Sequence, residues 1–131
     1  MIIAISDLRS INIANVTFFS TATSNVHFSS GRAITLHEEE LKNFASIIYS
    51  NMQKLPNIIV LPTLMVNMSL VEIIFTGGKT DQLILDFVDK SSLTIDGDNY
   101  EPFVKLLIKR APQKQSRIVT LNNNKIKGGG E

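Results

Sequence analysis

The sequence lacks cysteine and tryptophan and contains only two histidines. Without cysteine the chain has no disulfide, no thiolate metal ligand and no cysteine nucleophile. No apolar run is long enough to cross a membrane as a helix, and the residues after Met1 do not form a secretory signal. These absences predict an intracellular, cytoplasmic protein without a membrane segment.

What is present is a 131-residue chain that is 44% hydrophobic, enough for one real core but not for two large independent domains. The net charge of +1 hides an asymmetry along the chain. Residues 1–104 carry six basic and eleven acidic side chains, whereas residues 105–131 carry seven basic side chains and one acidic. A basic C-terminal segment can contact phosphates or can simply solubilise the chain, and charge alone leaves both interpretations open.

Two helices are predicted from apolar residues that recur at three- and four-residue spacing. The first covers about 36–54, and its start has Thr35 followed by Glu38 in the spacing of a capping box. The second covers about 99–110, with Asp98 as its N-cap. Each helix therefore has one apolar stripe that must be buried against strands.

Most of the remaining chain has the β-branched and aromatic composition of strands. The predicted strands lie at residues 11–20, 25–29, 33–36, 58–68, 70–76, 82–88, 93–95 and, in the tail, 117–121. Gly77 and Gly78 are predicted to form a hairpin turn. Alternation predicts that Val71, Ile73 and Phe75 share one buried face.

The order of these elements, strands then a helix and strands then a helix again, indicates an internal repeat. Residues 26–50 can be laid over 85–109 without gaps, and this alignment matches Phe44 with Phe103. Chance agreement between two amphipathic patterns is the alternative explanation.

The predicted fold class is α+β, with two tandem ββββα units, each a curved antiparallel sheet covered by its own helix. The first unit is expected to cover residues 1–56 and the second residues 57–112. Residues 113–131 are expected to form a flexible basic C-terminal tail that contains at most one strand.

One segment, Arg32-Ala-Ile-Thr-Leu-His-Glu-Glu-Glu-Leu-Lys-Asn-Phe44, resembles the strand-to-helix junction of positive-cofactor-four coactivator, Whirly and Pur-alpha proteins. Residues 92–100 are similar to a second, weaker copy of that junction. In topology the resemblance covers about residues 1–110. Those families bind single-stranded DNA or RNA across the sheet, so the resemblance implies a non-enzymatic protein with that activity.

The residues expected to bind nucleic acid are those that can stack on bases or hold phosphates. They are Phe19, His27, Arg32, Lys79, Lys109, Arg110, Lys114, Arg117, Lys125 and Lys127. The sheet face opposite the core is predicted to carry Thr17, Phe19, His27 and Ser29 in the first repeat and Glu72, Ile74, Ile84, Asp86 and Val88 in the second. The two acidic residues would repel phosphates, so binding is expected at the first repeat and the tail.

The alternative function is an oligomeric interaction or sequestering protein, of a phage type, that binds a host protein or a small anionic ligand. The apolar residues expected on the outer face of the second repeat favour a homo-oligomer. Gly77-Gly78-Lys79-Thr80 is not a phosphate-binding loop, because Ile73 stands where that loop needs glycine. Neither histidine has an acidic or serine constellation around it, so no catalytic residue, metal site or cofactor is predicted.

Overall fold

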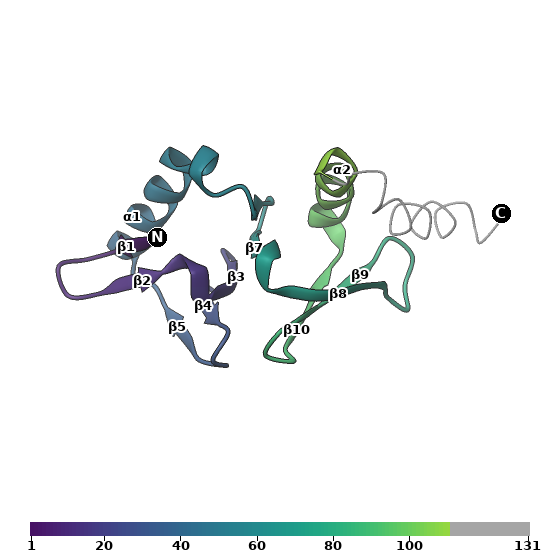
Figure 1. Cartoon of the computed structure of the whole chain (residues 1–131), viewed down its shortest axis with the longest axis horizontal. Coiled ribbons are helices and arrows are strands. Elements are labelled where there is room, and N and C mark those ends of the chain that lie inside the picture. The colour runs from purple at the N-terminus through teal and green to yellow at the C-terminus, as the bar shows by residue number, and fades with distance from the viewer. Residues whose placement is uncertain (111–131) are drawn as a thin grey trace. The chain divides into compact units, whose positions relative to one another are not determined.

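The structure, a computed structural model, describes residues 1–110 and is drawn in Figure 1. Its strands all pair antiparallel, and two α-helices accompany them, which confirms the α+β class. Contacts divide the chain into two compact units, Met1–Leu70 and Val71–Glu131. Within residues 1–110, no helix is both long enough and apolar enough to span a membrane. The predicted tail strand at 117–121 lies outside the described residues.

The first unit contains two sheets and one α-helix. A two-stranded sheet pairs β1 (Ile2–Ala4) with β2 (Ser10–Asn12). A five-stranded sheet follows the order β5 (Ala33–Thr35), β4 (Asn25–Phe28), β3 (Val16–Ser20), β7 (Leu64–Asn67) and β6 (Ile58–Val60). The short 3₁₀ helix η1 (Ile13–Asn15) separates β2 from β3, so the single strand predicted over 11–20 is in fact two strands.

The helix α1 (Glu38–Ser50) supplies the apolar stripe that the sequence predicted. Phe44 and Ile48 are buried, and the Phe44 ring centroid lies 5.2 Å from that of Phe19 in β3. The start of the helix differs from the prediction, because the N–H of His37 donates to Glu40 Oε1 at 3.1 Å. His37 is the N-cap of α1, whereas Thr35 ends β5 and its hydroxyl donates to Asn25 Oδ1 at 2.6 Å.

The second unit is described over residues 71–110. Its three-stranded sheet follows the order β10 (Ser92–Ile95), β9 (Leu83–Phe87) and β8 (Val71–Thr76), and α2 (Tyr100–Arg110) follows β10. Fully buried residues of β9, β10 and α2 form its core: Leu85, Phe87, Ile95 and Phe103. The Gly77 N–H donates to the carbonyl of Gln82, which confirms the predicted hairpin turn.

The division after Leu70 differs from the boundary predicted after residue 56. The cause is β7, which pairs with β3 of the first sheet through Phe18 and Val66, Phe19 and Met65, and Ser20 and Leu64. The strands of the predicted second repeat therefore belong to two sheets, with β6 and β7 in the five-stranded sheet and the later strands in the sheet of the second unit. Each α-helix follows five strands in the chain, whereas four were predicted.

The ladders that precede the two helices have the same register when Val26 is aligned with Leu85. Val26 pairs with Ile34 in the first ladder, and Leu85 pairs with Leu93 in the second. The connecting turns agree as well, because the N–H of Phe28 donates to the Arg32 carbonyl and that of Phe87 donates to the Ser91 carbonyl. In each turn one residue has positive φ: 89° at Gly31 and 71° at Lys90.

The register of β3 against β4 shifts between Val16 and Phe18, as at a β-bulge. As a result Val16 and Phe19 both face the core, at 0% and 4% exposure, while Phe18 lies beside His27. Phe19 was predicted on the outer face, and that prediction is wrong because the shift reverses the alternation beyond it.

The same shift occurs in β8 between Val71 and Ile73. Ile74 then pairs with the buried Leu85, whereas Ile73 and Phe75 pair with Asp86 and Ile84 on the outer face. Ile73 is 52% exposed and Phe75 is 42% exposed. The prediction that these two side chains belong to the core is therefore wrong.

Candidate functional site

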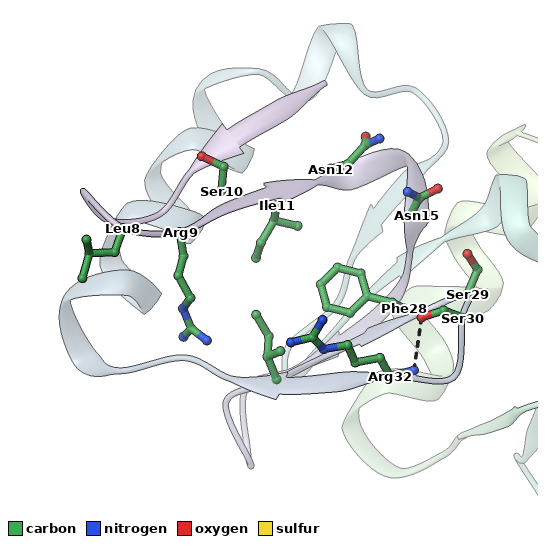
Figure 2. A pocket seen from close by; sticks show the side chains of 11 residues that line it. Leu8, Arg9, Ser10, Ile11, Asn12, Asn15, Phe28, Ser29, Ser30 and Arg32 are labelled. Atoms are coloured by element: carbon green, nitrogen blue, oxygen red, sulfur yellow. Dashed lines mark hydrogen bonds between the residues drawn. The ribbon is translucent and has the colours of Figure 1, made fainter.

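A hollow of about 640 Å³ lies in the first unit between β2 on one side and β4 and β5 on the other (Figure 2). β2 pairs with β1 along one edge, and no strand of residues 1–110 pairs with its other edge. Figure 2 shows that this second side of β2 borders the hollow. The lining residues are Leu8, Arg9, Ser10, Ile11, Asn12, Asn15, Phe28, Ser29, Ser30, Arg32 and Ile34.

Arg9 forms a two-pronged ion pair with Glu40 of α1, with Nε to Oε2 at 2.8 Å and Nη2 to Oε1 at 2.6 Å. The same Nη2 donates to the Thr35 carbonyl at 3.1 Å. Glu40 is 5% exposed, and the hydrogen bonds from Arg9, followed by the one from the His37 N–H, lower its pKa to about 2. Arg9 therefore joins the β1–β2 hairpin to α1 and β5, and its charge is already neutralised.

Arg32 is the other cation of the hollow, and its guanidinium has no hydrogen-bond or ion-pair partner within residues 1–110. Figure 2 shows its side chain extending from the turn before β5 toward the space beside Phe28. Serine hydroxyls and asparagine amides complete the rim. Such a lining suits an occupant that brings a negative charge and hydrogen-bonding groups to an open strand edge.

Of the described residues that were expected to bind nucleic acid, only Arg32 lines this hollow. Phe19 is buried against Phe44, and His27 stacks on Phe18 with ring centroids 4.1 Å apart and planes 15° from parallel. The predicted stacking residues are thus engaged with other side chains of their own unit.

In the second unit, Lys79 lies in the turn between β8 and β9, beside a hollow of about 320 Å³ that Asp81, Asp96 and Glu101 also line. These carboxylates make that hollow unfavourable for phosphate. Lys109 is an exposed residue of α2. Lys114, Arg117, Lys125 and Lys127 lie outside the described residues, as does the side chain of Arg110.

A second feature is the open edge of β8, which the sequence analysis missed because strict alternation placed Ile73 and Phe75 on the buried face. No strand within residues 1–110 pairs with the side of β8 that faces away from β9. Its only charged residue is Glu72, and Ile73 and Phe75 are exposed beside it. The β-bulge that brings these side chains to the surface has no sequence signal of its own.

Comparisons of the chain with protein-family models, with curated proteins and with solved structures found no match. The similarity to Whirly, Pur-alpha and positive-cofactor-four proteins therefore stays a prediction from residues 32–44 and 92–100. The site has to be interpreted from its own geometry.

Proposed function

We propose that this protein acts by self-association, as a non-enzymatic interaction protein whose copies join through the edges of their sheets. The observation that carries the proposal is β8. It is an edge strand with two large exposed apolar side chains, Ile73 and Phe75, and a single charge, Glu72. Edge strands of proteins that stay monomeric are usually protected by several charges, by proline or by a covering segment. An unprotected apolar edge favours a partner.

A tandem repeat supports the same proposal, because it would make a strand that is paired along one edge in one copy the counterpart of a strand whose edge is open in the other copy. We propose that residues 1–54 and 57–110 are two copies of one unit of five strands and a helix. The identical registers of β4–β5 and β9–β10 support this assignment, and so do the matching turns at Gly31 and Lys90. This unit has one strand more than the ββββα unit predicted from the sequence.

Size-exclusion chromatography with light scattering tests self-association directly. We expect the full chain to form oligomers whose mass rises with protein concentration. Replacing Ile73 and Phe75 together by Lys should shift the chain to monomer, because two buried ammonium groups would oppose the contact. Tyr49→Lys is the matched control, since Tyr49 is 65% exposed and belongs to α1 rather than to either edge strand. A full chain that stays monomeric at every concentration would overturn the proposal.

Single-stranded nucleic-acid binding is the second candidate, and it is favoured by the guanidinium of Arg32, which lines the hollow with Phe28 and has no partner within residues 1–110. A base could stack on an aromatic ring while the cation holds a phosphate. Filter binding of oligo-dT at low salt tests it, with retention expected to fall steeply as salt rises. Arg32→Ala should weaken retention, whereas Lys42→Ala should not, since Lys42 does not line the hollow. No retention at low salt would remove this candidate.

A further inference from the structure

The two strands with open edges, β2 and β8, correspond in the repeat to β7 and β3, and β7 and β3 pair with each other. The equivalence begins at β2 and β7, which correspond when Asn12 is aligned with Asn67. Asn12 ends β2, and its side-chain oxygen accepts the Ala14 N–H at 3.2 Å. Asn67 ends β7, and its side-chain oxygen accepts the Ser69 N–H at 3.1 Å.

The elements around these strands agree with that alignment. It places Arg9 over Leu64 and Ser6 over Leu61, and the carbonyl of Arg9 or Leu64 accepts the backbone N–H of Ser6 at 3.3 Å or of Leu61 at 2.7 Å, across the turn before its strand. The next strands fit the same alignment, because it places Val16 over Val71, and the register shift after Val16 in β3 recurs after Val71 in β8. β7 is therefore the second copy of β2, and β8 is the second copy of β3.

The difference between the copies is what each strand pairs with. β7 pairs with β3, and its residues Met65 and Val66 are 4% and 0% exposed. Its counterpart β2 is open along the corresponding edge, and Ser10 there is exposed. The counterpart of β3 is β8, which is open as well. Within residues 1–110 one such ladder, β3 with β7, is complete, whereas β2 and β8 are each paired on one side only and are open along the edges that would form the second ladder.

We infer that β8 of one copy adds to the free edge of β2 in a second copy, in the hollow beside Arg32. The inference rests on the proposed self-association and names its contact. Transferring the β3–β7 register to the equivalent strands pairs Ile73 with Ile11, Ile74 with Ser10, and Phe75 with Arg9. Both strands then gain the backbone hydrogen bonds that an open edge lacks.

The charges at the two edges also agree with this pairing. Continuing the register by one residue brings Glu72 of β8 opposite Asn12, which lines the same hollow as Arg32. Glu72 is exposed, and the Arg32 guanidinium has no partner within residues 1–110. A carboxylate entering this hollow would therefore meet a cation that is not yet paired.

The geometry of the assembly follows from having one donor edge and one acceptor edge in each copy. The contact is heterologous, so every copy that donates β8 still offers its own β2. Repetition of such a contact gives a closed ring when the rotation between copies closes, and an open filament otherwise. The smallest closed ring has two copies, in which β8 of each copy adds to β2 of the other and no edge stays open.

The absence of native cysteine allows a direct test by disulfide trapping. Two single-cysteine variants of the full chain, Ser10→Cys and Ile74→Cys, are prepared, one of them with an added tag that changes its size. The predicted pair faces across one ladder, within the distance a disulfide requires. We expect oxidation of the mixture to give a mixed disulfide of intermediate mass as the main product. A mixture of Ser10→Cys with Tyr49→Cys should give only background.

The outcomes separate this inference from the proposed function. Oligomers that form without the mixed disulfide would overturn the β8–β2 contact and leave self-association standing. Disulfides only between like variants would do the same, because they indicate a symmetric contact. In a chain that carries both cysteines, an intrachain disulfide as the main product would overturn the contact by showing that the two edges meet within one copy.

Discussion

Removing the Phe44 ring is expected to lower the free energy of unfolding by about 3–5 kcal/mol, the usual cost of truncating a buried phenylalanine to alanine. The side chain is 1% exposed and packs against the ring of Phe19. It also borders an apolar hollow of about 90 Å³ between α1 and the sheet. The cavity left by Phe44→Ala would add to this space, so we expect a cost in the upper half of the range.

Urea denaturation followed by circular dichroism measures this cost, as a lower midpoint with an unchanged slope. Tyr49→Ala is the control on the same helix, and because Tyr49 is 65% exposed its change should stay within about 0.5 kcal/mol. If Phe44→Ala leaves too little folded protein, Phe44→Leu should remain measurable, with a smaller loss than the alanine variant. Equal effects of Phe44→Ala and Tyr49→Ala would refute the packing of α1 described above.

Three further predictions concern single groups. The pKa of Glu40 is lowered to about 2 from an ordinary value of 4.5, so the unfolded chain binds this proton at a higher pH than the folded chain. Stability should therefore fall as the pH decreases from about 5 toward 2, and thermal melts of Glu40→Gln should show a weaker fall. Lys90→Gly should raise the unfolding free energy by up to about 1 kcal/mol, because Lys90 has a φ of 71°, which glycine adopts without strain. Gly31→Ala should lower the unfolding free energy by a similar amount, because alanine would be strained at the φ of 89° found there. Asn67→Ala should lower the unfolding free energy by about 1–3 kcal/mol, because the buried Asn67 side chain accepts two hydrogen bonds from Ser69. Asn12→Ala should lower it less, because Asn12 is more exposed, and chemical denaturation of both variants measures the difference.

The sequence predicted the parts of the fold that local periodicity determines. The stripe that contains Phe44 and Ile48 predicted α1, and Gly77 with Gly78 predicted the hairpin between β8 and β9. The alignment of 26–50 with 85–109 identified two segments whose ladders have the same register. These features depend on residues close together in the chain, so their signals survive in a single sequence.

What could not be predicted depends on a shift of one residue or on distant pairing. The β-bulges after Val16 and Val71 reverse which side chains are buried, and neither position has a composition that marks a bulge. The pairing of β7 with β3 joins strands on opposite sides of α1 in the chain. Arg32 was predicted as a binding residue and does line the hollow, whereas the Arg9–Glu40 pair was missed because the two residues are 31 positions apart.

The hairpin between β8 and β9 also marks where this chain tolerates a change in length. The pair Ser20 and Asn25, which closes the first copy's hairpin, corresponds to Phe75 and Ile84 in the second. The second hairpin adds one rung beyond that pair, Thr76 with Leu83, and a longer turn. The added residues are even in number, so every later side chain keeps its original face. A short peptide tag placed between Gly77 and Gly78 should therefore leave both ladders of this sheet intact, and it would provide a handle for following assembly without blocking either chain end.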